Sequence, residues 1–215
     1  MLTRRNQANS KRGDTLIEVL FAVTVFSLVA VGGLSIMNQG LTTAQRALEI
    51  TLVRQQIDAQ AETLRFMHSS YVAVYRLNGT YAAGTPAREW STMLESIKTA
   101  EEGEVTPGAS AFGTGGACLA IPDGSFLLNS QNATFIAPST TNVGPAKVYS
   151  RVDYTSSVAA RGEGIWIEAV RSPSNIANPS EPGFIDFHIR ACWDSPGQSI
   201  PVTLGTIVRL YEPRG

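Results

Sequence analysis

An uninterrupted apolar run near the N-terminus constrains this 215-residue chain more than any other feature. From Leu16 to Met37 the sequence reads LIEVLFAVTVFSLVAVGGLSIM, 22 residues in which Glu18 carries the only charge. At about 1.5 Å per residue, a helix of this length crosses the roughly 30 Å hydrocarbon core of a bilayer. The basic residues just upstream are Arg4, Arg5, Lys11 and Arg12. The positive-inside bias therefore predicts a cytoplasmic N-terminus and an extracytoplasmic remainder.

Two simpler interpretations of the apolar run compete. A secretory signal peptide would place a small-residue cleavage site after the apolar core. Here the run instead passes Gly32 and Gly33 into a helical pattern without a clear stop. A plain signal anchor stays open, because apolarity alone does not exclude it. Glu18 bears on this choice, since a carboxylate in a spanning segment costs roughly 3 kcal/mol and is by default a functional candidate. From its position alone, a solvated interfacial Glu18 is an equally good interpretation.

The residues around Glu18 make the interpretation more specific. The segment GDTLIEVL (13–20), preceded by Lys11 and Arg12, resembles the prepilin processing motif of type IV pilins and type II secretion pseudopilins. The resemblance implies that a membrane prepilin peptidase cuts after Gly13, so that Asp14 becomes the first mature residue and Glu18 the fifth. In that family the first mature residue is usually Phe or Met and its amine is N-methylated. Asp14 departs from this pattern, at a position that bears on N-methylation more than on cleavage.

The resemblance also implies the partners. Glu18 is expected to pair with the N-terminal amine of a neighbouring subunit and so to set the axial register of a fibre, mainly as a source of specificity. The expected partners are other subunits in a homo- or heteropolymer, the prepilin peptidase, an inner-membrane assembly platform with its extension ATPase, and the membrane before assembly. The precursor is expected in a bacterial inner membrane, and the assembled protein in an extracellular pilus or at the cell surface.

The charge balance bears on other ligands. The whole chain has 17 basic and 18 acidic residues; without the four basic residues of segment 1–13 it has 13 and 18, a net charge of −5. Such a chain has no global attraction for DNA phosphates. Binding to DNA or to a host surface therefore has no support in the composition.

The chain divides into three predicted parts: a basic leader at 1–13, a long helix at 14–70 that spans the membrane at about 16–37, and an extracytoplasmic globular head at 71–215. The helix is expected to end near His68. Its second half carries one apolar stripe from Ile50 through Val53 to Leu64 and another from Leu41 to Gln55, at spacings of three and four. Such an amphipathic helix should cover the sheet of the head.

The head is predicted to be α+β, with one antiparallel sheet packed on the second half of the long helix. A short helix is expected to begin at Thr85-Pro86 and to end at Glu101-Glu102-Gly103. The strand-like runs are Ala117–Ile121, Ser125–Leu128, Lys147–Tyr154, Gly164–Val170, Phe184–Trp193 and Val202–Tyr211. In the fifth run, strict alternation puts four residues on the apolar face: Ile185, Phe187, Ile189 and Ala191. The same alternation puts Cys192 on the polar face.

The two cysteines of the chain, Cys118 and Cys192, both fall in the predicted head. Disulfides persist outside the cytoplasm, so we expect these residues to pair; two free buried thiols are the alternative. The bond would close a loop of about 75 residues and contribute about 4 kcal/mol in the chain-entropy model. Because alternation places Cys192 on the polar face, the bond is expected at an edge or a bulge.

No catalytic constellation is visible in the sequence. His188, between Asp186 and Arg190, is predicted to be a surface-facing strand histidine, and His68 to support the C-terminal dipole of the long helix. No Walker loop, HExxH, CxxC or EF-hand pattern is present. We therefore expect no enzyme activity, no cofactor and no metal.

We therefore interpret the chain as a structural subunit, a major or minor pilin, of a type IV pilus-like filament that serves adhesion, motility or uptake. A type II secretion pseudopilin would have an identical N-terminus. An unprocessed membrane-anchored extracellular binding protein is the alternative from another class, and it would keep residues 1–13. An enzyme carried on a pilin-like stalk is disfavoured by the lack of catalytic motifs.

Overall fold

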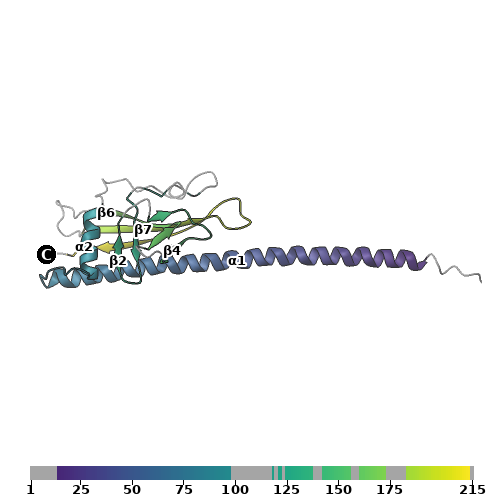
Figure 1. The fold of residues 1–215 in the computed structure, drawn as a ribbon, viewed down its shortest axis with the longest axis horizontal. Helices are drawn as coiled ribbons and strands as arrows, with labels where there is room; N and C mark the ends of the chain where they lie inside the picture. The colour runs from purple at the N-terminus through teal and green to yellow at the C-terminus, as the bar shows by residue number, and fades with distance from the viewer. Residues whose placement is uncertain are drawn as a thin grey trace, which may run out of the picture. The chain divides into compact units, whose positions relative to one another are not determined.

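The computed structural model describes residues 14–97, 118, 121–122, 124–137, 142–155, 160–172 and 183–213. The predicted leader and most of the predicted strand Ala117–Ile121 lie outside these ranges. The chain divides into two compact units, residues 1–45 and 46–215. The described elements form an α+β protein with a long N-terminal helix, as predicted (Figure 1).

Helix α1 (Asp14–Arg76) provides all the described residues of the first unit. Its most apolar 18-residue window has a mean hydropathy of 2.4, and none of that window is buried. It is the one helix in the described part of the chain that is long and apolar enough to cross a membrane. Gly32 and Gly33 do not interrupt it.

The helix extends beyond the predicted end at His68, because its last two turns also pack against the head. Tyr71 lies against the hydrophobic core. The end at Arg76 is a Schellman motif: Asn78 has a φ of 49°, its N–H donates to Tyr75 O at 3.0 Å, and the Gly79 N–H donates to Val74 O at 3.1 Å. An asparagine tolerates the left-handed conformation that this motif requires. The dipeptide Asn78-Gly79 thus lies just after the helix and ends it.

One of the two predicted stripes of α1 is buried in the head. Its buried apolar residues are Val53, Ile57, Ala61, Leu64 and Met67. The other predicted stripe is not buried, with Leu41 and Leu48 exposed by 69% and 58%. A helix packed on one layer buries one stripe, and in this helix it is the stripe from Val53 to Leu64.

The main sheet is antiparallel, in the order β6-β7-β8. It is made of β6 (Ile165–Ser172), β7 (Phe184–Trp193) and β8 (Val202–Tyr211). The last two strands have the predicted bounds. The apolar face of β7, from Ile185 to Ala191, is buried as alternation predicted, and it joins the α1 stripe in a single hydrophobic cluster.

The other described strands of the head form two further small sheets, so the prediction of one antiparallel sheet was too simple. β1 (Leu127–Asn129) pairs with β2 (Thr134–Ile136). β5 (Arg161–Glu163) pairs antiparallel with β4 (Arg151–Asp153) and parallel with β3 (Val143–Gly144). These strands have two or three residues each, which is too short for a period-two pattern to be detected in the sequence.

A second helix, α2 (Pro86–Ser96), lies next to the C-terminal part of α1 (Figure 1). Thr85 caps it by accepting a hydrogen bond from the Arg88 N–H at 3.3 Å, and the proline stands in the first turn as predicted. Trp90 and Met93 are buried. The helix ends at Ser96, before the predicted end at Glu101, whose position lies outside the described residues.

Polar side chains of α1 also reach into the head. Gln60 is fully buried, donates from Nε2 to Leu128 O at 2.8 Å and accepts at Oε1 from the Leu128 N–H at 2.9 Å. The amide thus acts toward β1 as a neighbouring strand would. Glu49, also buried, accepts hydrogen bonds from Trp193 Nε1 at 3.2 Å and from Ser195 Oγ at 2.6 Å. These contacts attach α1 both to β1 and to the end of β7.

The Gln60 contact predicts a specific loss of stability. Gln60→Ala leaves a buried N–H and a buried C=O of Leu128 without partners, so we expect the free energy of unfolding to fall by about 3 kcal/mol. Gln55→Ala is the matched control, because Gln55 is exposed on the same helix, and we expect a change within about 0.5 kcal/mol. Urea unfolding of the full chain in detergent, followed by near-UV circular dichroism, measures both. Equal effects of the two variants would contradict the structural role given to Gln60.

Candidate functional site

The predicted processing and assembly residues lie at the start of α1. Gly13 lies outside the described residues, Asp14 is the first helical residue, and the side chain of Glu18 is exposed. Residues four apart lie on the same face of a helix, separated by about 6 Å along its axis. An amine created at Asp14 by cleavage would therefore share a helix face with the carboxylate of Glu18.

The surface that follows Glu18 is apolar on every side. Each large apolar side chain from Leu16 to Met37 is exposed, with Phe26 the most exposed at 74%. Each Å² of such surface costs about 25 cal/mol in water, and large exposed apolar patches mark membrane or protein contacts. This segment therefore requires lipid or apolar protein around it.

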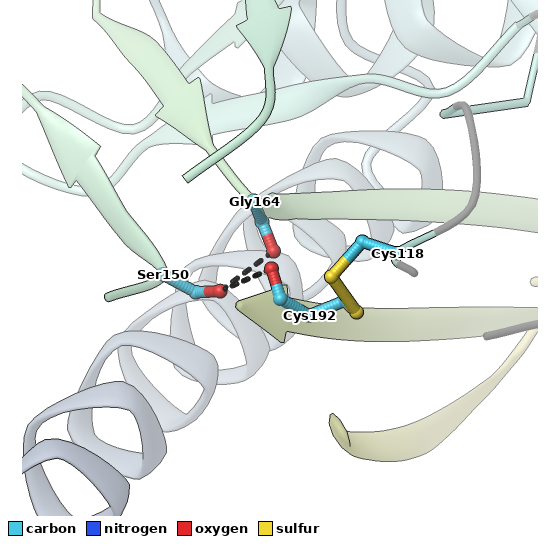
Figure 2. The surroundings of a disulfide bond; sticks show 4 residues. All are labelled: Cys118, Ser150, Gly164 and Cys192. Carbon is cyan, nitrogen blue, oxygen red and sulfur yellow. Dashed lines mark hydrogen bonds between the residues drawn. A yellow bond between two sulfur atoms is a disulfide. The ribbon is translucent and has the colours of Figure 1, made fainter. Parts of the chain in front are cut away.

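Cys118 and Cys192 form a disulfide, as predicted, with their Cα atoms 5.8 Å apart (Figure 2). Cys192 is only 1% exposed, so the expectation of a polar-face position at an edge was wrong. The reason is that β7 is the central strand of its sheet and is buried on both faces from Phe187 to Trp193. Strict alternation in the sequence cannot show that both faces are covered.

Two residues that the sequence did not single out shape the surroundings of the disulfide. The Ser150 hydroxyl lies 2.8 Å from Gly164 O and 3.1 Å from Cys192 O, and it donates between them (Figure 2). Gly164 has a φ of +65°, and a Cβ there would lie 2.5 Å from Cys192 O. Only glycine fits this close approach of two backbones. The Gly164 C=O also accepts from the Cys192 N–H at 2.8 Å.

The neighbouring Glu163 is a buried carboxylate held by two cations. Lys147 Nζ lies 2.8 Å from Oε1 and Arg151 Nε lies 3.0 Å from Oε2. Hydrogen bonds from Lys147 and then from Arg151 hold the pKa of Glu163 below its usual value, against the opposing effect of burial. The ionised carboxylate joins β5 to β4 and to the segment before β4.

The structure corrects both predicted roles of histidine. His188 is buried rather than surface-facing, and burial, with Arg190 nearby, lowers the pKa of its imidazole. His68 is not in the last turn of α1; its Nε2 lies 2.9 Å from Tyr211 O. Over the ranges that the structure describes, no cluster of three or more His, Cys, Asp or Glu residues could hold a metal ion.

A cavity of about 180 Å³ lies between the C-terminal turns of α1, helix α2 and the sheet. Its lining includes His68, Tyr71, Tyr75, Trp90, Tyr211 and Glu212. These aromatic residues come from separate segments of the chain, so the linear sequence alone does not bring Tyr71 and Tyr75 together with Trp90.

Comparison with family models, curated proteins and solved structures finds no match to this chain. The functional assignment accordingly rests on the chain's own residues. Two features carry chemistry that is not explained by packing alone: the apolar segment with Glu18, and the aromatic cavity of the head.

The disulfide predicts how the head responds to reduction. It joins residues 74 positions apart, and the loss of such a link costs about 4 kcal/mol in the chain-entropy model. We expect dithiothreitol to lower the urea midpoint of the full chain in detergent, by this loss of free energy divided by the m-value of unfolding. The double variant Cys118→Ser, Cys192→Ser should start at that lower midpoint and not respond to the reductant. A wild-type midpoint that does not move on complete reduction would contradict this expectation.

Proposed function

We propose that this protein is a structural subunit, a major or minor pilin, of a type IV pilus-like filament. A prepilin peptidase cuts the precursor after Gly13, and the mature chain is assembled through its apolar N-terminal helix. The observation that carries the proposal is a spacing in the sequence. Gly13, Glu18 and the 22-residue apolar run have the order and spacing of the prepilin motif.

The exposed apolar surface from Leu16 to Met37 supports this proposal. Before assembly, lipid surrounds this surface, and a window of mean hydropathy 2.4 suits that environment. In a filament, the same surfaces of neighbouring copies replace the lipid. A protein that had to act only as an anchor would need the apolar run, but would have no use for a cleavable leader or for a carboxylate inside the run.

In the proposed filament, Glu18 determines how neighbouring helices align along the fibre axis. It is the only charged residue between Leu16 and Met37. In a bundle of apolar helices, its carboxylate needs a counter-charge, because an unpaired buried charge costs several kcal/mol. The amine of Asp14 in a neighbouring subunit, created by cleavage, supplies that charge at one axial offset only.

The disulfide of the head fits an extracytoplasmic location, since disulfides persist in oxidising compartments. A type II secretion pseudopilin would share all of these features. The two functions differ in where the fibre is found, in long surface pili or in short fibres within the envelope.

The first test of the proposal is leader cleavage. We expect the protein from native cells to begin at Asp14, and Gly13→Ala to retain residues 1–13 because the prepilin motif has glycine at the position before the cut. Intact-mass measurement and N-terminal sequencing distinguish the two forms. A wild-type chain that still begins at Met1 would refute processing and favour the membrane-anchored binding protein.

The second test separates assembly from processing. Glu18→Ala should be cleaved normally, but the amount of protein in the sheared extracellular fraction should fall at least about tenfold, as follows from a pairing worth more than about 1.4 kcal/mol. Ser27→Ala is the matched control in the same segment, because the Ser27 hydroxyl donates only to Val23 O of its own helix at 2.8 Å. Normal assembly of the Glu18 variant would count against the intersubunit pair.

A further inference from the structure

The cavity of the head has a rigid aromatic wall. Tyr71 stacks on Tyr81 with ring centroids 5.0 Å apart and planes 14° apart, and its ring lies 6.4 Å from that of Trp90. His68 meets Trp90 edge-on at 5.1 Å. Rings that fix one another lose little side-chain entropy when a ligand binds, so the wall is already organised for contact.

Charged groups stand beside this wall. Arg171 donates from Nε to Glu212 Oε1 at 2.6 Å, and its Nη2 contacts the same oxygen. Both contacts in the described structure go to Oε1, which leaves Oε2 able to accept a hydrogen bond from a ligand, since a carboxylate can accept about four. The pair as a whole carries no net charge. The cavity therefore offers apolar rings and hydrogen-bonding groups without a net field.

The size of the cavity limits the ligand to one ring. At about 180 Å³ it is well below the roughly 300–1,000 Å³ of pockets for drug-sized molecules. A protein cavity of about 150 Å³ binds benzene, so this one admits a six-membered ring and part of its substituents. An extended peptide would need a longer groove.

We propose that this cavity binds one neutral pyranose ring, as at the end of a glycan. A pyranose presents a face of C–H groups, which stacks on aromatic rings, and a rim of hydroxyls, which pairs with charged and polar groups. The half-buried rings of Tyr71 and Tyr75 provide the first contact, with the buried Trp90 packed against Tyr71. The pair Arg171–Glu212 provides the second. A quaternary ammonium ion, the other ligand of aromatic cages, has no hydroxyl groups and would leave the hydrogen-bonding groups of the pair Arg171–Glu212 without a ligand partner.

The site lies entirely in the second unit of the chain, so the proposal does not depend on filament assembly. A head that binds sugars would serve attachment whether the chain is a pilin or an anchored protein. The closing experiment accordingly measures binding alone, on the full chain, without reference to leader cleavage.

The test uses saturation-transfer difference NMR with the methyl glycosides of glucose, galactose, mannose and N-acetylglucosamine. The full chain is held in a polyoxyethylene detergent, which carries neither a sugar nor a quaternary ammonium head group. We expect saturation transfer to at least one glycoside, strongest on the C–H groups of one ring face. Tyr75→Ala and Glu212→Gln should each weaken that binding at least about tenfold.

Matched controls keep the result specific. Tyr149→Ala removes another half-buried tyrosine, and Asp186→Asn removes the carboxylate of another ion pair, Arg209–Asp186; neither residue lines the cavity. Both controls should bind as the wild type does. Near-UV circular dichroism checks that each variant is folded. If Tyr75→Ala does not fold, the isosteric variant Glu212→Gln alone decides the test.

Three outcomes would overturn the proposal. One is the lack of saturation transfer to any of the four glycosides. Another is binding that survives both Tyr75→Ala and Glu212→Gln in folded protein. The third is binding of tetramethylammonium without binding of any glycoside, which would make the cavity a cation cage instead.

Discussion

The apolar surface of α1 between Leu16 and Met37 is the constraint on which the rest of this protein depends. Exposure of this surface to water is unfavourable, since each Å² of exposed apolar surface costs about 25 cal/mol of free energy. The same helix, some sixteen residues further on, supplies the buried stripe from Val53 to Met67 on which the sheet is built. One element therefore meets two different environments, and its sequence changes from apolar all round to apolar on one stripe. The polar side chains of Glu49 and Gln60 fix the second environment, because their hydrogen bonds hold only in one rotation of the helix against the head.

Regular periodicity made part of this fold predictable, and burial on both faces made part of it unpredictable. The strands β7 and β8 and the Val53–Leu64 stripe follow simple periods over ten residues or more, and the sequence indicated all of them. The two-residue and three-residue strands, including the parallel pair β3–β5, depend on contacts between distant segments. His188 and Cys192 occupy polar-face positions by alternation, yet both are buried because β7 is central in its sheet. Local sequence carries no information on what covers the second face.

The two candidate sites differ in the same way. The N-terminal motif is contiguous, so its spacing from Gly13 to Glu18 can be read directly, and it needs no fold to be recognised. The aromatic cavity takes its residues from 68–75, 90–94, 171, 185 and 210–213, and only the packing of α1, α2 and the sheet brings them together. The extension of α1 to Arg76 is decisive here, because a helix that ended at His68 would not place Tyr71 and Tyr75 at the cavity. The Schellman motif at Asn78 sets the end of the helix, and the packing of α2 and the sheet against its last turns completes the cavity.

The disulfide of the head and its ligand chemistry use separate parts of the fold. The disulfide, the Ser150–Gly164 contacts and the Glu163 ion pairs gather where the end of β7 meets β5 and the start of β6. The cavity lies near the opposite ends of these strands, where the start of β7 meets the end of β8: Ile185 and Leu210 are paired neighbours there and both line it. An antiparallel sheet makes this separation natural, since the two ends of a ten-residue strand lie about 30 Å apart. A substitution at a half-buried residue of the cavity, such as Tyr75→Ala, can therefore change ligand binding without loosening the disulfide or the Glu163 ion pairs.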